Sequence, residues 1–70
     1  MENLFGYRIK EIRQEKKLNQ REFAKLLNVT QGALCRWEIG ENVPNLEVLF
    51  QIAKILDISA DYLIGLTDDI

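Results

Sequence analysis

The sequence predicts an all-α fold of five short helices in one small domain. Along its 70 residues, apolar side chains recur at intervals of three and four, the spacing of a buried helical stripe. Residue types that favour helix N-caps precede four of these segments, at Asn19, Thr30, Asn45 and Ser59. No segment shows strand-like alternation bounded by hairpin turns. We therefore expect residues 1–70 to form a single helical domain.

The first helix is expected over residues 4–17. Phe5, Ile9 and Ile12 follow one another at spacings of four and three, so they form its buried face. Two lysines stand in its last turn, where positive charge suits the helix dipole.

The second helix is expected over residues 20–27. Asn19 precedes it and Glu22 follows three residues later, which is an asparagine version of the capping box. Asn28 tolerates a left-handed conformation and ends the helix. The residues expected to be buried are Phe23, Ala24, Leu26 and Leu27.

The third helix is expected over residues 31–38. Thr30 caps its start, Leu34 and Trp37 share its buried face, and Gly40 is expected to terminate it.

Two further helices are expected over residues 46–56 and 60–65, capped by Asn45 and Ser59. The longer helix carries two apolar stripes, and we expect the first to fill the core. The first stripe is Leu46, Leu49, Ala53 and Leu56, and the second is Val48, Ile52 and Ile55.

Composition excludes several classes of function. The chain has no histidine and a single cysteine, Cys35, which leaves no histidine chemistry, no internal disulfide and no multi-cysteine zinc site. One cysteine suits the reducing cytoplasm. No apolar run approaches the roughly 20 residues of a membrane span. We see no nucleophile–base pair or phosphate loop, so we expect no enzyme, no cofactor and no small-molecule ligand.

Charge is distributed unevenly along the chain. Residues 1–40 carry eight basic and five acidic side chains, a net charge of +3. Residues 41–70 carry one basic and six acidic side chains, a net charge of −5. The net charge of −2 therefore hides a basic half that can face phosphates. An ordinary solvated surface with no partner accounts for the same pattern.

The gap between the second and third helices is the most informative feature. Only two or three residues separate them, so the helices must cross steeply, as in a helix-turn-helix over about residues 20–38. The second helix of that motif lies in the DNA major groove. An ordinary helical corner in a bundle has the same spacing.

Residues 18–40, LNQREFAKLLNVTQGALCRWEIG, resemble the helix-turn-helix of phage repressor and Cro proteins, a lambda-repressor-like fold. The resemblance covers about residues 7–66. Its most specific parts are Leu18-x-Gln20, Ala24-x-x-Leu27, Trp37-Glu38-x-Gly40, Pro44 and Asp61-Tyr62-Leu63-x-Gly65. It implies sequence-specific binding of double-stranded operator DNA, commonly as a dimer.

Several residues fit DNA contacts in that setting. The Gln31 amide can make two hydrogen bonds to one adenine. The Arg36 side chain is long enough to reach a guanine or a backbone phosphate. Gly32 lies between them, at a position where the family often has a side chain that contacts a base. Glycine lets the backbone come close to the DNA but has no side chain to hydrogen-bond a base. The residues expected to contact phosphates are Gln20, Arg13, Lys16, Lys17 and Asn42. Glu41 departs from the basic residue common at its position and would repel phosphate.

The resemblance also implies an ion pair between Arg13 and Glu38, and self-association near the fourth helix. We expect the dimer interface to use the apolar side chains Val48, Ile55 and Ile58. The patch is small, so the homodimer should be weak and strengthened by DNA. The prediction is a transcriptional regulator, a repressor acting by operator occupancy. The alternative is a helical protein-interaction module, antitoxin-like or an adaptor, that binds a partner through the last two helices.

Overall fold

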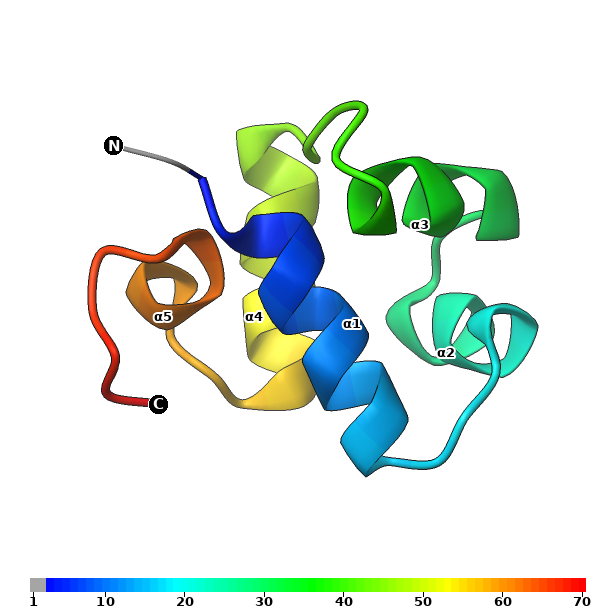
Figure 1. Cartoon of the computed structure of the whole chain (residues 1–70), viewed down its shortest axis with the longest axis horizontal. Helices are drawn as coiled ribbons and strands as arrows, with labels where there is room; N and C mark the ends of the chain where they lie inside the picture. The colour runs from blue at the N-terminus through cyan, green and yellow to red at the C-terminus, as the bar shows by residue number, and fades with distance from the viewer. Residues whose placement is uncertain (1–2) are drawn as a thin grey trace.

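The computed structural model describes residues 3–70, and every regular element in that range is an α-helix. Figure 1 shows α1 through the middle of the molecule, with α2 and α3 on one side and α5 on the other. Across the described residues, none of the helices has the length and apolar character needed to cross a membrane. The helices are α1 (Phe5–Glu15), α2 (Gln20–Leu27), α3 (Gln31–Glu38), α4 (Leu46–Leu56) and α5 (Ala60–Ile64).

The four predicted N-caps are all confirmed. Asn19 Oδ1 accepts the backbone N–H of Glu22 at 2.8 Å, and the Glu22 carboxylate accepts the Asn19 N–H at 2.9 Å, which completes the capping box. The side-chain oxygens of Thr30, Asn45 and Ser59 each accept the N–H three residues later. Each cap satisfies a donor that the helix itself leaves unpaired. These local bonds explain why the predicted starts of α2 to α5 match the structure.

Two predicted helix ends are one or two residues too long, because the backbone turns left-handed. Lys17 has φ 58°, and the N–H groups of Lys17 and Leu18 bond the carbonyls of Gln14 and Arg13, a Schellman motif that ends α1 at Glu15. Gly65, with φ 95°, ends α5 in the same way. Asn28 adopts the predicted left-handed conformation after α2, with φ 61°.

The core lies between α1, α2, α3 and single residues of α4 and α5. The rings of Phe5 and Trp37 meet edge to face, with centroids 5.6 Å apart. The predicted buried faces of α1 and α3 are confirmed. The buried apolar residues are Phe5, Ile9, Ile12, Phe23, Ala24, Leu27, Leu34, Trp37, Ile52 and Leu63.

The predicted core stripe of α4 holds at Leu49, Ala53 and Leu56, which are half-buried and pack against the core, but it is wrong at Leu46 and omits Ile52. Leu46 is 82% exposed, whereas Ile52 of the second stripe is fully buried. Beside Ile52, Gln51 Nε2 donates to the carbonyl of Leu27 at 3.0 Å, a bond that ties α4 to the end of α2. Leu46 is the first residue of α4 and lines an open hollow with Phe5 and Leu49. Leu26 is a second error: it is 46% exposed because it falls outside the stripe that α2 buries.

Arg8 is a buried charge that the sequence patterns did not reveal. Its guanidinium donates to the carbonyls of Tyr62 and Thr67 and to the Asp68 carboxylate, each at 2.7 Å. It also lies 4.0 Å from the centroid of the Tyr62 ring. Arg8 thus caps the end of α5 and ties the last residues of the chain to α1.

Candidate nucleic-acid interface

The turn between α2 and α3 is built from three residues. Asn28 reverses the chain, the N–H of Val29 bonds the carbonyl of Ala24 at 3.0 Å, and Thr30 caps α3. Val29 packs against the core and anchors the turn. Because the turn is held at both ends, the angle between the two helices is fixed.

The outer face of α3 carries the residues predicted to read bases. Gln31, Gly32 and Arg36 are exposed, while Leu34 and Trp37 on the opposite face are buried. Figure 1 shows α3 at the edge of the molecule beside α2. The helix can therefore present its polar side to a partner without disturbing the core.

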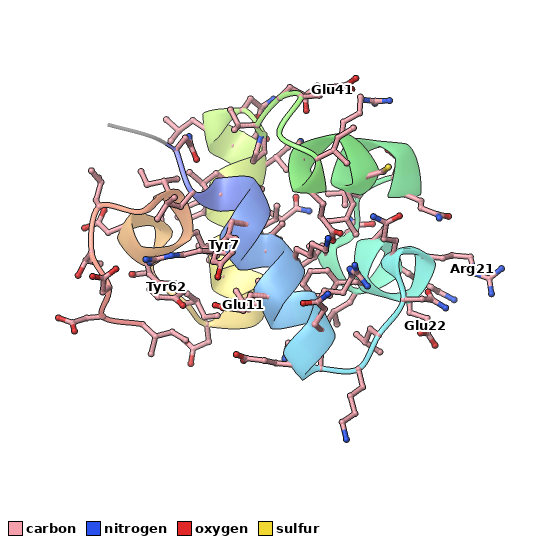
Figure 2. All side chains as sticks on the ribbon, viewed as in Figure 1. Tyr7, Glu11, Arg21, Glu22, Glu41 and Tyr62 are labelled. Atoms are coloured by element: carbon pink, nitrogen blue, oxygen red, sulfur yellow. The ribbon has the colours of Figure 1, made fainter. Side chains whose placement is uncertain are left out.

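The starts of α2 and α3 lie next to each other. Asn19, Gln20, Arg21 and Gln31 line a hollow of about 390 Å³ between them. The first backbone N–H groups of each helix have no partner within the helix, and this end of the helix dipole favours anions. Figure 2 shows Arg21 extending outward from the start of α2. Sequence reasoning missed Arg21, although its place in the first turn of α2 was a usable signal.

Arg13, Gln20 and Glu38 form a hydrogen-bonded network between α1, α2 and α3. The predicted pair is present: Arg13 Nε lies 2.8 Å from Glu38 Oε2, and Arg13 Nη2 lies 3.0 Å from Oε1. Gln20 Nε2 donates to the same Oε1 at 3.1 Å. The Glu38 side chain is only 3% exposed, and its hydrogen bond raises the pKa of the Arg13 guanidinium. The last residue of α3 is thereby fixed to both neighbouring helices.

In this network the side chains of Arg13 and Gln20, both predicted to contact phosphates, are hydrogen-bonded within the protein. Arg13 Nη1 also donates to the Leu18 carbonyl at 3.1 Å, so the guanidinium is held among protein acceptors. The amide nitrogen of Gln20 is likewise engaged by Glu38. At the start of α2 the backbone N–H of Gln20 is the donor suited to an anion.

The other predicted phosphate contacts are exposed. Lys16 and Lys17 follow α1 immediately, and Asn42 lies in the loop between α3 and α4. Figure 2 shows Glu41 at the tip of this loop, next to α3. Its carboxylate keeps negative charge close to Asn42, as the sequence suggested.

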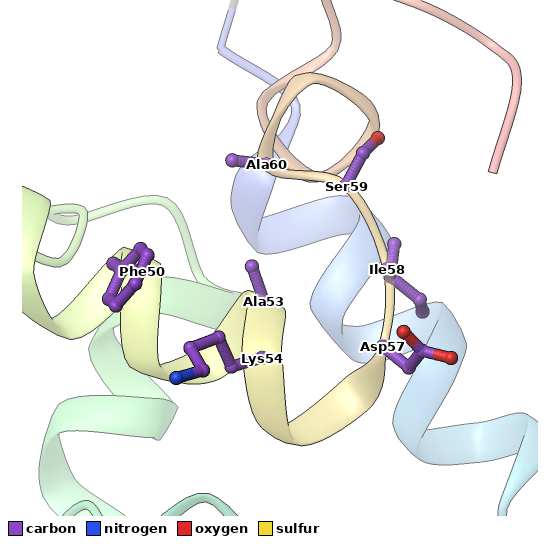
Figure 3. Close-up of a pocket in the computed structure, with 7 residues that line it drawn as sticks. All are labelled: Phe50, Ala53, Lys54, Asp57, Ile58, Ser59 and Ala60. Atoms are coloured by element: carbon purple, nitrogen blue, oxygen red, sulfur yellow. The ribbon is translucent and has the colours of Figure 1, made fainter.

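The side chains predicted for self-association differ in exposure. Val48 and Ile58 are half-buried and pack against the core, while Ile55 is 42% exposed. Figure 3 shows Phe50 and Ile58 on opposite sides of a hollow of about 410 Å³ at the turn between α4 and α5. Phe50 is 63% exposed and was missed by sequence reasoning, although it follows Leu46 by one helical turn.

A model of the helix-turn-helix family matches residues 9–63. The chain belongs to this family. It is 38% identical over 61 residues to the HTH-type transcriptional regulator YqaE of Bacillus subtilis (strain 168), covering 87% of this chain and 53% of that protein. It is equally identical over 61 residues to Repressor protein C2 of Salmonella phage P22, covering 87% of this chain and 28% of that protein.

Solved helix-turn-helix proteins have the same arrangement of helices. A transcriptional regulator from Listeria innocua aligns with a TM-score of 0.84 at 26% identity, covering 100% of this chain and 65% of that one. The P22 c2 repressor, solved with synthetic operator 9T, aligns with a TM-score of 0.77 at 37% identity, covering 86% and 91%. The predicted likeness to phage repressors is confirmed. The chain spans about half the length of the first curated relatives it matches.

Proposed function

We propose that this chain binds duplex DNA sequence-specifically, in the cytoplasm, and represses transcription by occupying an operator, without catalysis. The observation that carries the proposal is the outward face of α3, where Gln31 and Arg36 stand exposed on a helix locked at both ends. The major groove is about 12 Å wide and admits one helix. The P22 c2 repressor, a relative with the same fold, was solved with an operator, and we transfer that partner here.

Each set of residues has a distinct role in the proposal. Gln31 and Arg36 make paired hydrogen bonds to base edges, to adenine and guanine respectively. The start of α2 with Arg21, together with Lys16, Lys17 and Asn42, contacts phosphates and sets the register on the duplex. Arg13 and Glu38 hold α3 in place for this contact.

Selection of bound duplexes from a random pool tests the proposal. We expect enrichment of a near-palindromic site whose half-sites lie about one DNA turn apart. Recovery of a random pool, with no enriched sequence, would contradict sequence-specific binding and favour a protein-interaction module.

Replacing both Lys16 and Lys17 with glutamine should weaken binding to all duplexes alike. Each lost phosphate contact reduces the slope of log affinity against log salt by about 0.9. Affinity measured across a salt series checks this. The control is Lys10→Gln. Lys10 lies on a face of α1 with Tyr7, Glu11 and Gln14, and none of these residues is among the proposed DNA contacts. Equal slopes for the double variant and the control would remove the two lysines from the interface.

We also propose that two copies associate weakly through α4 and the turn after it, with Val48, Ile55 and Ile58 at the interface. The exposed side chains of Leu46 and Phe50 extend the apolar surface along α4. Glu47 and Lys54 flank Phe50 and line one hollow with it. In an antiparallel pairing of two α4 helices, Glu47 of one copy meets Lys54 of the other, so the charges are self-complementary.

Replacing Ile55 with glutamate should abolish self-association, because it places two like charges in the apolar contact. Ile55 is 42% exposed, so the fold should tolerate the change. Sedimentation, alone and with a two-half-site duplex, measures the outcome, with Ile58→Glu as a second variant. Tyr7→Glu, at an exposed residue of α1, is the control. If Ile55→Glu sediments like wild type in both conditions, the interface lies elsewhere.

A further inference from the structure

We infer that Gly32 positions Arg36, and that the missing side chain at Gly32 determines which base pair Arg36 reads. A Cβ built at Gly32 would have one side-chain neighbour within 4 Å beyond the adjoining residues, Arg36 Nη1 of the same helix at 3.6 Å. The guanidinium thus lies back over the first turn of α3, across the glycine. This inference rests on the proposed function.

Helix geometry explains why Arg36 reaches Gly32. Side chains four residues apart lie on one face of a helix, and long side chains point toward its N-terminus. Arg36 therefore covers the turn one pitch before its own Cα, about 5.4 Å along the axis. At Gly32 no side chain stands in that path.

The position of the guanidinium matters for recognition because base contacts come from the N-terminal residues of a recognition helix. The Cα of Arg36 lies in the last turn of α3, but its guanidinium lies over the first turn, where Gln31 begins the helix. We therefore expect Arg36 and Gln31 to read neighbouring base pairs, a guanine beside an adenine.

Two substitutions at Gly32 separate positioning from simple loss of glycine. In Gly32→Ala the added Cβ makes ordinary van der Waals contact with Arg36 Nη1 at 3.6 Å, so the guanidinium stays in place. In Gly32→Val two methyl groups extend beyond this Cβ, and we expect them to displace the guanidinium from the glycine. Both residues favour a helix more than glycine does, so α3 should fold in each variant.

The experiment compares selected sequences for wild type, Gly32→Ala, Gly32→Val and Arg36→Ala. We expect wild type and Gly32→Ala to select the same guanine beside the adenine. Gly32→Val and Arg36→Ala should lose the guanine preference by about 5- to 150-fold, the range of one paired base contact, and keep the adenine. Nuclear Overhauser contacts between the Arg36 side chain and the Gly32 α-protons, measured without DNA, provide an independent readout.

Two results would overturn the inference. One is a guanine preference that survives in Gly32→Val. The other is a uniform loss of affinity for all duplexes in Gly32→Val, which would mean that the glycine serves close backbone approach. If wild type selects no sequence, the proposed function fails. The nuclear Overhauser contact between Arg36 and Gly32 in the free protein then decides whether the two residues interact, and the absence of that contact would reject the positioning.

Discussion

Replacing Gly6 with alanine should lower the stability of the domain markedly. A Cβ at Gly6 would overlap the carbonyl oxygen of Trp37 and lie 3.1 Å from its carbonyl carbon. These are backbone atoms near the end of α3, so no rotamer change relieves the overlap and α1 must move away from α3. The helix-propensity gain of about 1 kcal/mol is outweighed by this displacement and by lost packing of Trp37 on Phe5.

We expect a net destabilisation of about 2 kcal/mol for Gly6→Ala, which lowers the Tm by about 8–16 °C in a domain of this size. Thermal melts followed by circular dichroism measure it. Gly32→Ala is the matched control, since this helical glycine faces only the flexible Arg36 side chain, and its Tm should rise. A Tm for Gly6→Ala at or above that of wild type would show that α1 and α3 do not approach as described.

Replacing Arg13 with methionine should cost about 3–5 kcal/mol, because it leaves a buried carboxylate without its charged partner. Glu38 is 3% exposed and would keep only the hydrogen bond from Gln20. An exposed ion pair would contribute less than about 1 kcal/mol. The measured loss of unfolding free energy therefore distinguishes a buried pair from an exposed one. Urea unfolding of the free protein provides the measurement.

The double variant Arg13→Met with Glu38→Gln tests the origin of this loss. Because it removes the buried charge, it should be more stable than Arg13→Met alone, so the two changes are not additive. Equal unfolding midpoints for wild type and Arg13→Met would mean that the pair does not hold α3.

The elements of this fold could be predicted because their signals are local. The helix caps depend on hydrogen bonds between residues only three positions apart, so the residue type at the cap is enough to predict them. The capping residues are Asn19, Thr30, Asn45 and Ser59. Which residues of the two stripes of α4 face the core depends on how the helix is rotated against α1, α2 and α5, and these contacts are long-range. Arg8 bonds residues more than 50 positions away, and no pattern around it indicates them.

In the candidate site too, features that depend on local patterns could be predicted, and features that depend on long-range contacts could not. The exposure of Gln31 and Arg36 follows from the periodicity that buries Leu34 and Trp37. The inward turn of Arg13 and Gln20 depends on where the end of α3 meets α1 and α2, which periodicity does not specify. The position of Arg36 over Gly32 likewise required coordinates.

The most direct test of sequence-specific binding compares two duplexes of equal length across a salt series. One carries the selected site and the other the same bases with both half-sites scrambled. We predict that the selected duplex binds at least about 10³-fold more tightly at physiological salt, while affinity for both falls as salt rises. Equal affinity for the two duplexes at every salt concentration would contradict the account.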